Sequence, residues 1–265
     1  MPPFAIAQVT PYPWEDEHEV NAFVRALSAE LARRGHRVVI AAPSRSPELV
    51  RESRRAIRAG DALPGPGEVR VLGVGELLPI GTMRHGVAPA PPVDVARTLE
   101  ELLSQTPFDL AHVHEPFAPS AASVALRQSR ALNVGTFHAP TERVLSTQVA
   151  RRFVERFFGR LDARVASFAA TGELLARHFP GSYDVIAPGA DAAPRAPDGD
   201  GPLHLAFAGG EERAALRLFL RALRRLPDDL DWRATVCAPG GAAPTVRSAL
   251  RERVSVVSDT EAPVD

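Results

Sequence analysis

The chain has 265 residues, of which 45% are hydrophobic, and its formal net charge is −1. This length suits two modest domains, or one domain and part of another, and the balanced charge gives no overall attraction to nucleic acid or anionic lipid. All 31 basic residues are arginine, so Walker-type phosphate loops, Schiff-base enzymes and lysine-dependent kinases are excluded.

The single cysteine, Cys237, allows neither an internal disulfide nor a thiolate zinc cluster. Residues 1–9 lead directly into an apolar strand and lack the pattern of a signal peptide. The sequence has no apolar run of about 18 residues that would predict a membrane span. These features favour a cytoplasmic protein.

The first elements form a strand–helix–strand unit. Strands are predicted over Phe4 to Thr10 and Arg37 to Ala42, with Gly35 ending the helix between them. The apolar face of that helix follows from a helical spacing: Val20, Phe23, Val24, Leu27 and Leu31. Two strands joined by a helix within about 40 residues predict parallel pairing with a right-handed crossover.

The next segment, residues 43–68, is predicted to be a long connection with one short helix over residues 48–59. A strand over Val69 to Val74 follows, and then an irregular stretch, residues 77–92. The spacing of apolar residues predicts a helix over residues 93–104.

The next strand runs toward Pro116 and ends in a polar cluster: His112, His114 and Glu115. A neighbouring strand, Asn133 to His138, also ends in a histidine before a predicted helix. In a parallel sheet both strand ends lie on the same rim, where open α/β sheets bind their ligands. We therefore expect His114 and His138 to face one crevice.

A long helix with a phenylalanine stripe surrounded by arginines is predicted over residues 141–161. Strands over residues 163–170 and 183–188 follow, with a short helix over Glu173 to Phe179, capped by Thr171, between them. The predicted domains are a Rossmann-like domain, a Pro- and Ala-rich linker and a reduced second Rossmann-like unit: residues 1–190, 191–202 and 203–265.

Within the second unit, strands are predicted over residues 203–208, 232–238 and 254–257. Helices are predicted over residues 213–226 and 245–250. The unit is shorter than the ~100 residues usual for a doubly wound domain, which predicts that it is incomplete.

Four short motifs resemble, in order and spacing, the α/β GT-B glycosyltransferases of the family-4 type, and bacterial phosphatidylinositol mannosyltransferases among them. The motifs are Pro11-Tyr12, His112 to Pro116, Gly135 to His138 and Pro188 to Asp191. The resemblance implies retaining transfer of a sugar from a nucleotide sugar to a hydroxylated acceptor, which is small or a phosphorylated lipid. It implies no obligatory metal or other cofactor.

The resemblance also implies roles for individual residues. His138 is the expected catalytic residue, where the family meets the transferred sugar. The expected acceptor-binding residues are Tyr12, Asn21, Arg84, His114, Glu115, Thr141 and Arg143. Arg143 stands in place of a family lysine, and its planar guanidinium suits a phosphate. The expected donor-binding residues are Gly189, Asp191 and Arg213.

Departures from the family pattern lie on the donor side. His18 and Glu19 stand where the family has two glycines that approach the diphosphate, and Arg213 is the lone cation after the strand at residues 203–208. The chain as given is therefore expected to transfer sugar poorly or not at all. A non-catalytic binding or regulatory protein on the same scaffold stays open as an alternative.

Two further alternatives stay open. His112 and His114 have the spacing of a metal pair, which with His138 and an aspartate would suit a metal-dependent hydrolase. The arginine-rich helix at residues 141–161 would suit peripheral contact with the inner face of an anionic membrane. The arginines of residues 213–226 do not outweigh the balanced charge, so no nucleic-acid partner is expected.

Overall fold

The computed structural model describes residues 2–75, 93–116, 121–138, 158–189, 201–208, 213–227, 229–238, 246 and 248–258. The chain folds as two compact units, Met1–Gly189 and Ala190–Asp265. The predicted linker over residues 191–202 and the predicted long helix over residues 141–161 lie largely outside the described residues.

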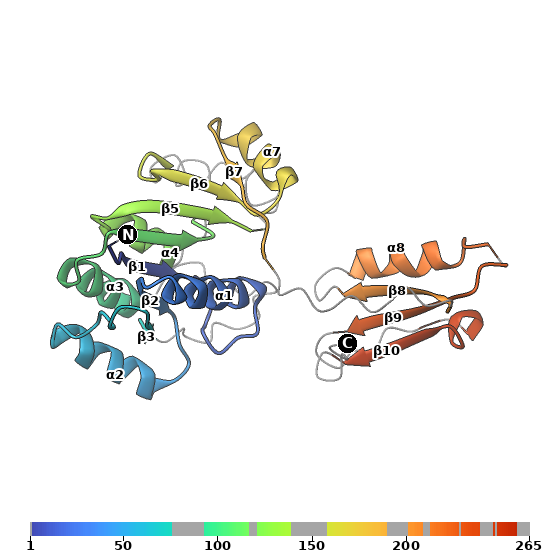
Figure 1. Cartoon of the computed structure of the whole chain (residues 1–265), viewed down its shortest axis with the longest axis horizontal. Coiled ribbons are helices and arrows are strands. Elements are labelled where there is room, and N and C mark those ends of the chain that lie inside the picture. Colours follow the sequence, from blue (N-terminus) through green and yellow to red (C-terminus); the bar gives the residue numbers. More distant parts are fainter. Residues whose placement is uncertain are drawn as a thin grey trace. The chain divides into compact units, whose positions relative to one another are not determined.

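The N-terminal unit is built on a seven-stranded sheet in the order β3-β2-β1-β4-β5-β6-β7 (Figure 1). Every neighbouring pair is parallel. The strands are β1 Ala5–Val9, β2 Arg37–Ala42, β3 Val69–Gly73, β4 Leu110–His114, β5 Leu132–Phe137, β6 Ala163–Ala166 and β7 Asp184–Val185. The α/β class with a parallel sheet is therefore confirmed, and the carboxyl ends of all its strands share one edge.

Helices cover both faces of this sheet (Figure 1). Their bounds are α1 Glu19–Arg33, α2 Pro47–Arg58, α3 Val93–Gln105, α4 Ala121–Gln128 and α7 Ala169–His178. On one face Val20 and Val24 of α1 pack against Ile40 of β2. On the other face Leu99 of α3 and Leu126 of α4 join the larger core.

Helix α1 differs from its predicted amphipathic face. The residues that it buries include the polar Asn21 and Ser28 beside Val20 and Val24, whereas Leu27 and Leu31 are half-buried. The helix has therefore turned relative to the apolar stripe, and it brings polar side chains over the sheet. Its predicted end is confirmed, because Gly35 has a φ of +91° and donates from its backbone N–H to the Ala32 carbonyl at 2.7 Å.

Three elements near the end of this unit differ from their predictions. β6 stops at Ala166 instead of residue 170, because α7 already begins at Ala169. The N-cap of α7 is Phe168, which has no side-chain acceptor, so the expected capping by Thr171 is wrong. The strand predicted over residues 183–188 shrinks to two exposed residues at the edge of the sheet.

The C-terminal unit holds a three-stranded parallel sheet in the order β10-β9-β8. Its elements are β8 Leu203–Ala208, α8 Arg213–Leu223, β9 Trp232–Ala238, the 3₁₀ helix η2 Ser248–Leu250 and β10 Val254–Ser258. Apolar residues of α8 and of the strands form its core around Trp232 and Val236. The helix predicted over residues 245–250 is thus a single 3₁₀ turn in the described part. Across both units, none of the described helices is both long and apolar enough to cross a membrane.

Candidate functional site at the carboxyl edge of the sheet

Alternation along the strands sorts the polar residues onto one face of the sheet. In β4, Val113 joins the main core, so by alternation His112 and His114 point to the opposite face, the one that α1 covers. Gln8 of β1 lies on this same face beside His112 in register. Phe23 of α1 meets the ring of His114 edge-on, with centroids 5.8 Å apart.

His114 and His138 meet on this face, as predicted. Nδ1 of His114 lies 3.1 Å from Nε2 of His138, and their rings are 5.4 Å apart and nearly parallel. Nε2 of His114 bonds Oε1 of Gln8 at 2.8 Å, and Nδ1 of His138 bonds the Ser167 hydroxyl at 3.2 Å. Both nitrogens of each ring are therefore engaged within the protein.

These histidines are buried instead of lining an open crevice. His114 has no exposed surface, and the exposed fraction of His138 is 6%. Burial lowers the pKa of His138 to about 4, helped by repulsion from His18, and it lowers the pKa of His114 well below the usual value. Both rings are therefore neutral near pH 7. Contact of His114 with an acceptor stays a prediction, and it would require movement of the residues above it.

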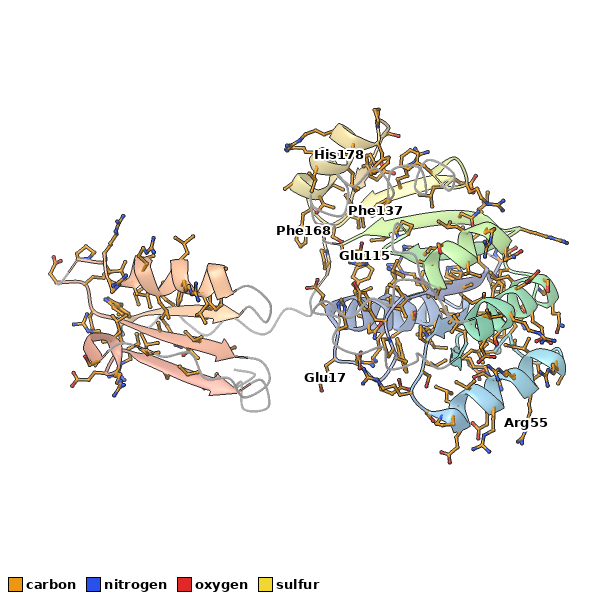
Figure 2. All side chains as sticks on the ribbon, turned by 180° about the vertical axis from the view of Figure 1, so that it is seen from behind. Glu17, Arg55, Glu115, Phe137, Phe168 and His178 are labelled. Atoms are coloured by element: carbon orange, nitrogen blue, oxygen red, sulfur yellow. The ribbon has the colours of Figure 1, made fainter. Side chains whose placement is uncertain are left out.

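Glu115 connects the ends of β4 and β5. Its backbone N–H donates to the Thr136 carbonyl at 2.9 Å, and its Oε1 accepts from the backbone N–H of His138 at 2.8 Å. Its φ of +49° is in the left-handed region that non-glycine residues rarely adopt. Figure 2 shows Glu115 near Phe137, at the ends of the two strands. The carboxylate thus holds the backbone of His138 in place.

Asn21 braces the loop between β1 and α1. Its side-chain amide donates to the Pro13 carbonyl at 2.7 Å, and its Oδ1 accepts from the Thr10 hydroxyl at 2.8 Å. The residue is 1% exposed, so its polar atoms serve the loop in this structure. Its predicted contact with an acceptor stays a prediction.

Tyr12 and His18 close this loop against the start of α1. Their rings are stacked with centroids 3.5 Å apart. His18 is the N-cap of α1, and its Nδ1 accepts from the backbone N–H of Val20 at 3.1 Å. An N-terminal amide that could have bound an anion is therefore already engaged by a side chain, with the exposed Glu19 beside it.

The roles of the remaining predicted site residues stay predictions. Gly189 is the last described residue of the N-terminal unit, and Arg213 opens α8 in the other unit. Four more lie outside the described residues: Arg84, Thr141, Arg143 and Asp191.

Two site residues were missed by sequence reasoning. Gln8 sits inside an apolar strand, and Ser167 follows another, so neither belongs to a motif or to a polar cluster. A signal exists only for Gln8: a single amide within an otherwise apolar buried strand requires a buried partner.

The metal alternative finds no support in this geometry. Within the described residues, no group of three histidine, cysteine, aspartate or glutamate side chains is placed to hold a metal ion. His112 is bonded through Nε2 to the Thr136 hydroxyl at 2.6 Å, and both nitrogens of His114 are in use.

A cavity lined by Thr106, Phe108 and Arg130 lies at the opposite, amino-terminal ends of β4 and β5.

Comparison with known proteins gives relatives for this arrangement. Over 186 residues the chain is 29% identical to a phosphatidyl-myo-inositol mannosyltransferase of Propionibacterium freudenreichii. The aligned region covers 68% of this chain and 45% of that protein. Over 161 residues it is 30% identical to the protein of the same name from Mycolicibacterium smegmatis, covering 61% of this chain and 37% of that protein. The chain thus spans less than half the length of these relatives.

Solved structures share the fold at low identity. A glycosyltransferase from Rickettsia africae has a TM-score of 0.60 at 14% identity, covering 97% of this chain and 69% of that one. The apo lipopolysaccharide outer core galactosyltransferase WaaB has a TM-score of 0.59 at 10% identity, covering 96% and 68%. Together with the parallel sheet, these neighbours confirm the predicted GT-B-like fold class.

The family model named Glycosyltransferase Family 4 matches residues 20–193, which is most of the N-terminal unit and more than half of the chain. The match includes most of α1, both histidines of the pair and Glu115. The chain therefore belongs to Glycosyltransferase Family 4.

Proposed function

We propose that the N-terminal unit binds the acceptor of a glycosyl transfer at the carboxyl edge of its sheet, with His138 as the organising residue. The acceptor is a hydroxylated molecule, either small or a phosphorylated lipid. The donor is a nucleotide sugar, and the anomeric configuration is retained. Family membership and the names of the relatives support this reading.

One observation supports the placement more than any other. His138 stands at the end of β5 and is held through its backbone by Glu115, through one nitrogen by His114 and through the other by Ser167. A neutral imidazole held in one orientation can accept from a sugar hydroxyl at Nδ1, in place of Ser167, without first losing conformational freedom. Three hydrogen bonds that fix a single side chain at a binding edge favour a functional role for that residue.

The test is sugar transfer by the full chain. GDP-mannose and UDP-glucose are offered with myo-inositol phosphate or with vesicles that contain phosphatidylinositol, and products are detected by mass spectrometry. His138→Ala is expected to abolish any transfer and to weaken acceptor binding, whereas His178→Gln, at the end of α7, serves as a control (Figure 2). Equal acceptor binding by wild type and His138→Ala, or measurable transfer that is equal in the two proteins, would contradict the proposal.

A second function is favoured by the start of α1. The engaged N-cap and the adjacent carboxylate of Glu19 oppose binding of a diphosphate there. A non-catalytic acceptor-binding or regulatory protein could tolerate this loss of diphosphate binding. Thermal-shift titrations with GDP, UDP and ADP separate the two functions. Stabilisation by a nucleotide favours transfer, and stabilisation by acceptor alone favours the regulatory protein.

Peripheral contact with an anionic membrane is proposed only in connection with a lipid acceptor. Sedimentation of the full chain with vesicles, with and without anionic lipid, tests this contact. Binding that requires anionic lipid supports it, and binding to neither kind of vesicle contradicts it.

A further inference from the structure

A chain of buried hydrogen bonds crosses four neighbouring strands beneath α1. It runs from Gln8 in β1 through His114 in β4 and His138 at the end of β5 to Ser167 after β6, with successive distances of 2.8, 3.1 and 3.2 Å. The exposed fractions of its four members are 0, 0, 6 and 1%. Water therefore has little access to the chain, and each member depends on its neighbours for partners.

The chemistry of Gln8 gives the chain a direction. Its Oε1 can only accept, so Nε2 of His114 carries the hydrogen at that contact. A neutral His114 then accepts at Nδ1, and Nε2 of His138 must donate to it. This leaves a lone pair on Nδ1 of His138, which accepts from the Ser167 hydroxyl. Gln8, at the other end of this series of hydrogen bonds, thus determines which nitrogen of His138 is a base.

The bond to Ser167 is the longest of the three, and it is the one at the end of the chain. A substrate hydroxyl that replaces the serine hydroxyl would meet the same lone pair and donate the same kind of hydrogen bond. No covalent bond changes and no proton is transferred in this exchange. The other two bonds keep the ring in its tautomer and orientation.

We propose that Gln8 and His114 are positioning residues that hold His138 as the Nε2–H tautomer and present its Nδ1 lone pair to a substrate hydroxyl. The role of that hydroxyl rests on the proposed function, whereas the tautomer is a property of the resting protein. The two can therefore be tested separately.

The variants are chosen to change Gln8, at the β1 end of this series of hydrogen bonds. Gln8→Leu removes the acceptor at similar size. Gln8→Glu keeps an acceptor at the same place and adds a charge that favours protonation of the histidine pair. His112→Gln is the matched control, because His112 lies on the same strand with its ring 4.3 Å from that of His114, yet its Nε2 bonds Thr136 instead of the chain.

The experiment is ¹⁵N NMR of the full chain labelled at histidine, without ligand. In wild type and in His112→Gln, His138 is expected to show a protonated Nε2 and an unprotonated Nδ1. Gln8→Leu is expected to give a mixture of tautomers, and Gln8→Glu to keep the wild-type tautomer while raising the protonation midpoint of the pair by about one pH unit or more. Should Gln8→Leu fail to fold, Gln8→Glu alone decides.

Two results would overturn the proposal. The first is a hydrogen on Nδ1 of His138 in wild type, which would mean that the Gln8 amide is reversed and that every donor in the chain points the other way. The second is a His138 whose tautomer is unchanged in Gln8→Leu and whose protonation midpoint is unchanged in Gln8→Glu. Changes of the same size in His112→Gln would count equally against the proposal.

A second arm measures acceptor binding. Gln8→Leu is expected to weaken the binding of myo-inositol phosphate about tenfold, with Gln8→Glu at neutral pH closer to wild type. Equal acceptor affinity in wild type and Gln8→Leu would overturn the positioning role. If the tautomer behaves as expected but no sugar or acceptor perturbs His138, the proposed function fails while the resting chain of bonds stands.

Discussion

Acid should destabilise the N-terminal unit through its buried histidines, and His138→Gln should remove part of that effect. Burial holds the pKa of His138 at about 4, against about 6.5 in an unfolded chain. Since the unfolded state binds the proton first, the stability of the neutral form is fully present above pH 6.5. It is lost as the pH falls from 6.5 toward 4.

The magnitude follows from the same two values. Each pH unit between them costs about 1.4 kcal/mol per histidine, so wild type should lose about 2 kcal/mol more than His138→Gln between pH 7 and pH 5. His112, whose pKa burial also lowers to about 4, should act in the same direction and with similar size. Losses common to both proteins, such as those from carboxylates, cancel in the comparison.

The assay is urea unfolding of the full chain at a series of pH values, followed by tryptophan fluorescence. Trp14 packs beside α1 in the N-terminal unit, and Trp232 lies in the core of the other unit. A Trp232→Phe background therefore makes the signal report the N-terminal unit. If the unfolding free energies of wild type and His138→Gln run parallel from pH 7 to pH 5, then His138 titrates as in an unfolded chain and the reasoning is refuted.

Three further changes test the scaffold around the site by thermal or urea unfolding. Glu115→Ala should cost about 2 kcal/mol by removing a charged acceptor, and Glu115→Gly should recover about half by relieving the positive φ; equal stabilities would argue against strain there. Gly75→Ala should cost about 2 kcal/mol, since its Cβ would lie 2.7 Å from Cγ2 of Val95, whereas Gly60→Ala meets no atom within 4 Å and should cost about 1 kcal/mol; a reversed order would contradict the packing. Asn21→Ala should cost about 3 kcal/mol, because buried partners in the loop after β1 lose their bonds, and a loss below about 0.5 kcal/mol would show that the loop does not depend on it.

Much of the fold could be predicted because the apolar strands are short, clearly bounded and alternate with helices. The bounds of β2, β8 and β9 agree with their predictions. Strand ends were less predictable where no residue marks the boundary: α7 begins after Phe168, which provides no cap signal. The edge strand β7 is shorter than its apolar sequence predicted, since only Asp184 and Val185 pair with β6.

The candidate site was predictable in outline and not in detail. Parallel strands that end in histidines indicated that His114 and His138 would meet, and their rings do bond. The sequence did not indicate that the pair would be buried, because that depends on how α1 lies over the sheet. Nor could it identify Gln8 and Ser167 as partners, since these contacts join residues far apart in the chain and follow from strand order and register.

The most direct test of the proposed acceptor site is to follow the His138 ring nitrogens by ¹⁵N NMR while myo-inositol phosphate, or vesicles carrying phosphatidylinositol, is added to the full chain. A hydroxyl that takes the place of Ser167 should shift Nδ1 of His138 in a saturable way and leave the ring of His178 unchanged. Saturable binding that leaves His138 unperturbed, or that shifts only histidines away from the carboxyl edge of the sheet, would contradict the assignment of this edge as the acceptor site.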